Sequence, residues 1–202
     1  MPQLLKSGKN NKKLGIKINK KKWKNLPIYS LTLEERNTCP SHCEQWDNCY
    51  GDNMPFAHRF DHTHPEFLQN LTMNLMRLFR LHPNGIVIRL HVLGDFFSKE
   101  YVKYWESCLK IFNGLHIMGF THHRQHDELG ILIKKLNKNP RCVIRFSDDQ
   151  STLLSAHVIS DSSEITNYSN AIICPEQLLK TQNCGTCALC WTSDKTILFI
   201  KH

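Results

Sequence analysis

Apolar and polar residues alternate along this chain in segments that have the periods of strands and helices. Apolar or β-branched runs predict strands at residues 28–33, 86–92, 115–120 and 143–146, and shorter strands at residues 156–159, 171–173 and 196–200. Apolar positions with a period of three to four residues predict helices at residues 64–80, 98–112 and 129–136. Strands and helices therefore alternate through most of the sequence.

This alternation predicts an α/β fold. We expect either a partial (β/α) barrel or an open, mostly parallel sheet, with outer helices and cysteine-rich metal-binding loops. The near-continuous apolar strands fit a sheet that is buried on both faces. We divide the chain into a basic N-terminal arm at residues 1–24, a partial-barrel domain at residues 25–173 and a cysteine-rich metal-binding segment at residues 174–202.

Charge is distributed unevenly. Nine lysines and no acidic residue lie in residues 1–24, whereas the rest of the chain balances 17 basic against 18 acidic residues. A basic arm on a neutral body predicts contact with DNA or RNA, although a solvated tail that only aids solubility explains it equally well. Because the sequence contains no membrane-spanning apolar run and no apolar signal segment, we expect a cytoplasmic protein without membrane contact.

Seven of the nine cysteines form two groups. The first cysteine group has the spacing C-x3-C-x5-C and consists of Cys39, Cys43 and Cys49. The second cysteine group has the spacing C-x9-C-x2-C-x2-C and consists of Cys174, Cys184, Cys187 and Cys190. Because the cytosol keeps thiols reduced, such groups indicate metal binding rather than disulfides. Four thiolates suit zinc or an iron–sulfur cluster, and three leave one coordination position open.

Polar residues follow several predicted strands. The carboxyl ends of parallel strands meet at one edge of a sheet, where α/β proteins place their sites. Gly94 and Asp95 follow the second main strand, Thr121 follows the third, and Arg145 and Ser147 lie at the end of the fourth. The Asp95 carboxylate is a candidate general base or cofactor contact, and a helix cap is the alternative.

The segment from residue 28 to residue 98 resembles the front half of a radical S-adenosylmethionine enzyme. The likeness rests on a strand, the three-cysteine loop ending in Cys49-Tyr50, a helix, and a second strand ending in Gly94-Asp95. It implies that the first cysteine group binds a four-iron cluster, and that Gly94, Asp95, Thr121 and Arg145 contact S-adenosylmethionine. Asp95, Arg145 and Ser147 would be the catalytic residues. In this chain five residues, not the usual two, separate the last two cysteines.

A closer likeness is to the gene product 88 family of phage and bacterial proteins. It covers most of the chain and rests on short motifs: Lys13-Leu-Gly15, Thr38-Cys-Pro40, Cys49-Tyr50, Arg89-Leu-His91, Gly94-Asp-Phe96, Tyr101, Trp105 and Cys174-Pro175. This resemblance implies a phage or mobile-element setting and specifies no activity.

The sequence leaves three functions open. The first is a radical-SAM-like iron–sulfur enzyme that acts on a nucleic acid or a nucleotide, with an auxiliary cluster on the second cysteine group. The second is a zinc-containing, transglycosylase-like enzyme that exchanges bases in DNA, with Asp95 or Asp148 as nucleophile or base. The third is a non-enzymatic zinc protein that binds nucleic acid through residues 6–24.

Overall fold

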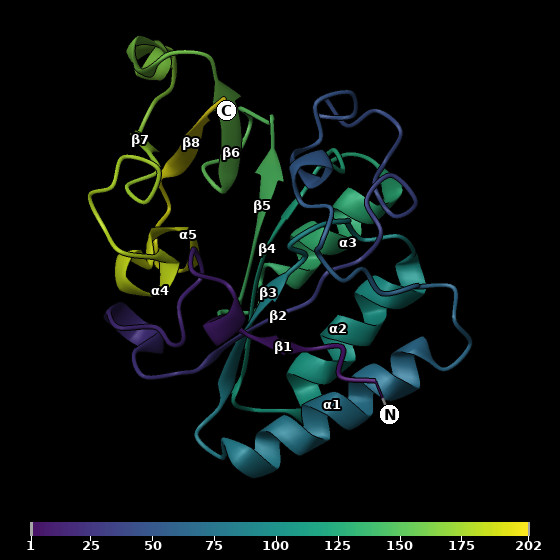
Figure 1. The fold of residues 1–202 in the computed structure, drawn as a ribbon. Helices are drawn as coiled ribbons and strands as arrows, with labels where there is room; N and C mark the ends of the chain where they lie inside the picture. Colours follow the sequence, from purple (N-terminus) through teal and green to yellow (C-terminus); the bar gives the residue numbers. More distant parts are fainter. Residues whose placement is uncertain (1, 202) are drawn as a thin grey trace.

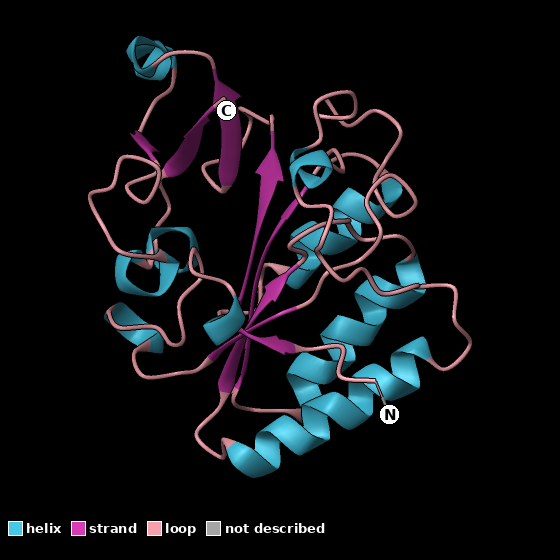
Figure 2. Cartoon of the chain, viewed as in Figure 1, coloured by secondary structure: helices cyan, strands magenta, loops and turns pink. Residues whose placement is uncertain are grey.

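The protein is built on one open sheet of eight strands (Figures 1 and 2). The computed structural model describes residues 2–201 and gives the strand order β1-β2-β3-β4-β5-β6-β8-β7. Only the β1–β2 pair is antiparallel, and the other neighbouring pairs are parallel. The strands are β1 (Lys6–Ser7), β2 (Ile28–Ser30), β3 (Ile86–Leu90), β4 (Leu115–Thr121), β5 (Cys142–Ser147), β6 (Ser155–Ile159), β7 (Ala171–Ile173) and β8 (Thr196–Ile200). The predicted open, mostly parallel sheet is confirmed, and the strands do not close into a barrel.

Three long helices connect the central strands. The α-helices are α1 (Phe67–Leu81), α2 (Lys99–Ile111), α3 (Glu128–Leu136), α4 (Cys184–Cys187) and α5 (Leu189–Thr192). The 3₁₀ helices are η1 (Gly8–Asn10), η2 (Lys21–Trp23), η3 (Tyr50–Asn53) and η4 (Ser162–Asn167). The helix α2 starts where its sequence predicts, because the Ser98 hydroxyl accepts a hydrogen bond from the Tyr101 amide at 3.1 Å.

The sheet is wound in one direction. The strands β2 to β6 are neighbours in the order of the chain, and α1, α2 and α3 lie in the first three connections between them. Right-handed connections that always step the same way place every helix on the same face. Figure 1 shows α1, α2 and α3 together on one face, which we call the outer face, and α4 and α5 on the opposite, inner face.

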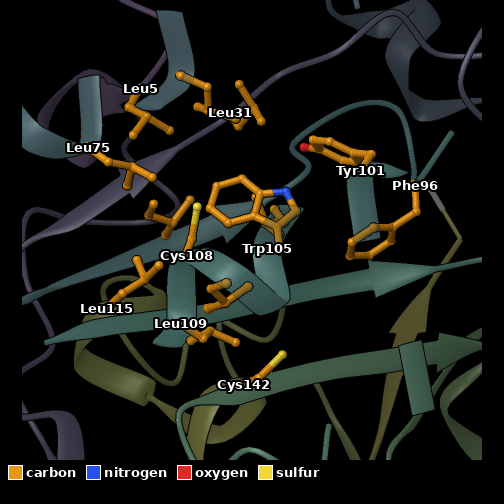
Figure 3. Packing of buried hydrophobic residues seen from close by; sticks show 14 of the residues in the cluster. Leu5, Leu31, Leu75, Phe96, Tyr101, Trp105, Cys108, Leu109, Leu115 and Cys142 are labelled. Atoms are coloured by element: carbon orange, nitrogen blue, oxygen red, sulfur yellow. The ribbon is translucent and has the colours of Figure 1, made fainter. Parts of the chain in front are cut away.

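The outer face carries the larger hydrophobic core. Alternate residues of β3 point toward the helices, so that Ile86 and Ile88 are fully buried there. Trp105 lies at the centre of this core, with Tyr101, Leu109 and the isolated Cys108 around it (Figure 3). This packing fixes the strands and therefore the positions of the loops at their carboxyl ends.

The inner face is covered by the two ends of the chain. Val87 and Met118 of the sheet pack against Ile18 and Trp23 from the N-terminal segment and against Trp191 from α5. The N-terminal segment and the C-terminal helices lie side by side on this face (Figure 1). The inner core thus joins residues that are nearly the whole sequence apart.

The N-terminal segment is part of the fold and not a free arm. Leu5 and Ile18 are fully buried, and Trp23 anchors the segment in the inner core. β1 extends the sheet, while residues 14–18 form no strand and contribute only an isolated bridge between Lys17 and Pro27. The sequence did not predict this packing, because the apolar residues between the lysines are too irregularly spaced to show a strand or helix period.

A buried histidine in the outer core predicts a dependence of stability on pH. His91 is 4% exposed and its Nε2 lies 2.9 Å from the Tyr101 hydroxyl. Burial, and secondarily Arg89, lowers the pKa of His91 to about 3. The unfolded chain therefore binds a proton below about pH 6.5 that the folded chain does not bind, and the free energy of unfolding falls as the pH falls.

We expect His91→Gln to weaken this dependence. Between about pH 6 and pH 5 the free energy of unfolding of the unmodified protein should fall by about 1 kcal/mol more than that of the variant. Urea unfolding at several pH values measures the difference. Equal slopes for the protein and His91→Gln would contradict the expectation.

Candidate functional site

The first cysteine group lies on the long loop between β2 and α1, at the carboxyl edge of the sheet. The Leu33 amide donates to the Leu93 carbonyl at 3.0 Å, and the Asp95 amide donates to the Thr38 hydroxyl at 3.1 Å. Gly94 permits this contact, because its φ is +84° and a Cβ there would lie 2.5 Å from the Thr38 hydroxyl oxygen. Gly94, predicted to bind cofactor, thus brings the cysteine loop onto the strand end.

An ion pair holds the far part of this loop. The Arg59 guanidinium donates to both carboxylate oxygens of Glu35, at 2.6 and 2.5 Å, and also to the carbonyls of Gly51, Met54 and Ala57. The hydrogen bonds from Arg59 hold the pKa of Glu35 below its usual value. This network fixes the segment that follows Cys49.

The thiols of the first cysteine group are partly buried and close enough to affect one another. Burial, reinforced by the Asp95 carboxylate and by the thiols of Cys43 and Cys49, raises the pKa of Cys39 to about 12. Burial raises the pKa of Cys43 to about 11. Such thiols need a nearby cation to become thiolates at neutral pH, and a bound metal supplies one.

The second cysteine group lies on the inner face. Cys184 and Cys187 bound α4, Cys190 lies in α5, and Cys174 follows β7. The charges of Cys174 and Cys190 add to burial in raising the pKa of Cys184, so these thiols are also neighbours. Gly185 is required between them, because a Cβ there would collide with the Lys17 carbonyl.

The potential metal ligands of the protein differ in how compactly they are grouped. Within residues 2–201, the one group of three or more His, Cys, Asp or Glu ligand atoms within 4.8 Å of one another is Glu34, Asp61 and His62. Neither cysteine group is therefore as compact as four thiolates around one zinc ion, which lie about 3.8 Å apart. A four-iron cluster accommodates wider spacing, because each thiolate binds a different iron. Thiolates are ligands of iron–sulfur clusters and of zinc, so the chemistry of the donor set fits both.

Arg145, predicted as a catalytic and cofactor contact, is fully buried beneath the second cysteine group. Its guanidinium donates to the carbonyls of Cys190 at 3.1 Å, Ser193 at 2.6 Å, Lys195 at 2.8 Å and Ser155 at 3.4 Å. These bonds use four of its five donors. Its visible role is to hold the C-terminal segment on the sheet.

A second inner-face arginine was not among the predicted site residues. Arg89 of β3 lies over the Phe120 ring at 4.5 Å and donates to the Leu90 carbonyl, but within residues 2–201 no ion pair joins it to a carboxylate. Burial lowers its pKa, while Tyr50, Cys190 and Cys184 raise it. The alternation of β3 placed this residue on the inner face, but only the fold brings both cysteine-bearing segments to it.

Asp95 braces the strand ends. Its carboxylate accepts hydrogen bonds from the Phe96 amide and the His122 amide, both at 2.7 Å, and the residue is 1% exposed. Burial raises the pKa of this carboxyl. Thr121 is also buried, and its hydroxyl accepts from the His123 amide at 3.1 Å. Asp95 therefore holds the β3 and β4 loops together, and Thr121 orders the start of the β4 loop.

A cavity of about 450 Å³ lies next to His122, whose amide binds Asp95, and polar residues line it. The lining includes His42, His122, Ser147, Asp148 and Asp149. Of the three predicted catalytic residues, Ser147 is the one that lines it. The cavity has the size of a small-molecule site.

Asp148 is the chemically distinctive residue of this cavity. It has a φ of +57°, a conformation that non-glycine residues seldom adopt. His122 Nδ1 lies 3.8 Å from its Oδ2, and His157 Nδ1 lies 3.7 Å from its Oδ1. Oδ2 is buried without a hydrogen-bond partner, and burial raises the pKa of the carboxyl. A group of this kind can accept or donate a proton at Oδ2.

The pairing of these two histidines with Asp148 was missed, because the residues lie far apart in the sequence. His122 follows β4 and His157 lies within β6, and only the parallel order β4-β5-β6 brings both to Asp148. The strand-end position of Asp148 was visible in the sequence. The left-handed backbone conformation of Asp148, which orients its carboxylate, could not be predicted from the sequence.

The fold and the site define the class of this protein. It is an α/β protein with a singly wound open sheet, and its carboxyl edge carries a three-cysteine loop and a cavity lined by acidic and histidine residues. A second cysteine group lies on the inner face. Comparison with protein families narrows this class. The chain belongs to the gene product 88 family, which matches residues 3–193. No curated protein and no solved structure matches the chain. Within residues 2–201, no helix has both the length and the apolar character needed to cross a bilayer.

Proposed function

We propose that this protein is an iron–sulfur enzyme of the radical S-adenosylmethionine type that acts on a nucleic acid or a nucleotide. One observation carries the proposal: the first cysteine group lies at the carboxyl edge of a singly wound parallel sheet, next to a cavity with acidic and imidazole side chains. Cys39, Cys43 and Cys49 would hold the catalytic cluster. The second cysteine group would hold an auxiliary cluster.

The proposed chemistry divides between cluster and protein. When bound, a cluster with one open iron supplies the electron that cleaves S-adenosylmethionine. The chain provides the cavity, in which Ser147 can hydrogen-bond a substrate and Asp148 can hold or move a proton at Oδ2. Asp95 and Thr121 are positioning residues that keep the strand-end loops in place.

The charge of the inner face supports an auxiliary cluster. A thiolate-ligated cluster is anionic, and Arg89 and Arg145 are the two charges that act on Cys190 to lower its pKa. Burying such an anion requires opposite charge close by. These arginines supply that charge without using a carboxylate partner.

Purification under anaerobic conditions tests the proposal. We expect a brown protein that absorbs at about 400 nm and contains on the order of eight iron atoms and eight sulfides per chain. A colourless protein that contains zinc and no iron, also after reconstitution with iron and sulfide, would contradict the proposal.

A zinc-containing enzyme that exchanges bases in DNA is the second candidate. It is favoured by Asp148, a buried carboxylate with an unpartnered oxygen in the cavity, which suits a nucleophile or base better than the fully bonded Asp95. Incorporation of a labelled base into DNA, abolished by Asp148→Asn, would support this candidate. The absence of incorporation with every candidate base would count against it.

A further inference from the structure

The N-terminal segment forms a hollow of about 380 Å³ that is separate from the cavity at the carboxyl edge. Three lysines line it, Lys9, Lys12 and Lys17, and no acidic residue does. Asn11, Asn19 and Asn183 add side-chain amides to the same lining. The hollow therefore combines positive charge with hydrogen-bond donors.

Three lysines of the N-terminal segment outside the hollow contact other parts of the protein. Lys13 forms an ion pair with Glu176 at 3.4 Å, Lys22 donates to the Pro140 carbonyl at 3.4 Å, and Lys6 lies 5.6 Å from the centre of the Phe60 ring. The three lysines of the hollow differ from these. In the described part of the chain, no ion pair joins Lys9, Lys12 or Lys17 to a carboxylate. Their charges are free to bind an anion.

The backbone of the hollow is fixed by the cysteine-bearing helix α4. The Cys184 amide donates to the Lys13 carbonyl at 2.7 Å, and the Gly185 amide donates to the Leu14 carbonyl at 2.9 Å. In return, the Asn19 amide donates to the Gly185 carbonyl at 2.9 Å. The three lysines thus extend from a rigid loop, which lowers the entropic cost of binding compared with a flexible tail.

We propose that this hollow binds the phosphodiester backbone of a nucleic acid strand. Lysine ammonium groups and side-chain amides are common contacts to phosphate oxygens. Ile16, which is 59% exposed and lines the hollow, offers an apolar contact to a sugar or a base. A concave surface rich in amides suits a strand better than a flat membrane. That the strand is the enzyme's substrate rests on the proposed function. In that case, the three lysines would bind the phosphodiester backbone of the substrate.

Fluorescence anisotropy with a labelled single-stranded oligonucleotide of about 12 nucleotides tests the proposal on the full-length protein. The variant Lys9→Gln/Lys12→Gln/Lys17→Gln should bind about tenfold or more weakly, and the slope of log affinity against log salt should fall by about two. The control is Lys103→Gln/Lys134→Gln/Lys138→Gln, which removes the same charge from exposed positions in and just beyond α2 and α3. It should bind like the unmodified protein, and thermal unfolding verifies that both variants are folded.

Two results would overturn the proposal. One is an equal loss of affinity in both variants, which would show a general charge effect. The other is an unmodified protein that binds no oligonucleotide but sediments with phosphatidylserine vesicles, which would assign the hollow to a membrane surface. Binding needs neither iron nor activity. A colourless protein that still binds through the three lysines would therefore refute the iron–sulfur proposal alone, and a brown protein that fails to bind would refute this one alone.

Discussion

Replacement of Arg145 by methionine is expected to lower the free energy of unfolding by about 3–5 kcal/mol. The variant keeps a side chain of similar length but removes the donors that bind the carbonyls of Cys190, Ser193 and Lys195. Those carbonyls would be left partly buried without partners, and each such loss costs about 1–3 kcal/mol. The result would make Arg145 one of the strongest links between the sheet and the C-terminal segment.

Urea unfolding, followed by tryptophan fluorescence, measures this effect. Trp191 is 1% exposed in the inner core beside the affected segment, so its emission reports on the region directly. Arg80→Met is the matched control, because Arg80 is exposed on α1, and it should change stability by less than about 0.5 kcal/mol. A loss below about 1 kcal/mol for Arg145→Met would mean that water replaces the guanidinium at little cost.

The two cysteine groups are expected to bind iron independently. Serine replacement of all three cysteines of the first group should remove about half of the iron, and replacement of all four cysteines of the second group should remove the other half. The reason is that, besides burial, the thiols that raise each thiol pKa come from its own group: the thiols of Cys43 and Cys49 act on Cys39, and those of Cys174 and Cys190 act on Cys184. Iron and sulfide analysis of anaerobically purified variants measures the outcome.

The isolated cysteines provide the control. Cys108 and Cys142 are 3% exposed in the outer core, and their replacement by alanine should leave the iron content unchanged. Complete loss of iron from either group variant, when the variant remains folded, would show that the groups share one site. Unchanged iron in both variants would exclude thiolate ligation by these residues.

The central part of the fold was predictable because its signals are local. The runs that became β3, β4 and β5 are continuous and apolar, and Ser98 caps α2 as its sequence predicts. The strand order at the C-terminal edge of the sheet was not predictable from local signals. β8 lies between β6 and β7, an order that no period in the sequence encodes.

The candidate site was predictable in composition but not in roles. The sequence identified the cysteine groups and the polar strand ends. It could not show that backbone amides occupy both oxygens of Asp95 or that carbonyls surround Arg145, because their partners come from other strands and from the C-terminal segment. Asp148 became the stronger acid–base candidate only when β4 and β6 placed a histidine on each side of it.

The closure of the inner face by both ends of the chain has a consequence for synthesis on the ribosome. The outer core can assemble once α3 and β5 have emerged, but Val87 and Met118 are only partly covered, by Ile18 and Trp23, until Trp191 has been made. A nascent chain would therefore expose an apolar surface during most of its elongation, a state that invites aggregation or chaperone binding. Truncation from either end should leave the same surface open to water.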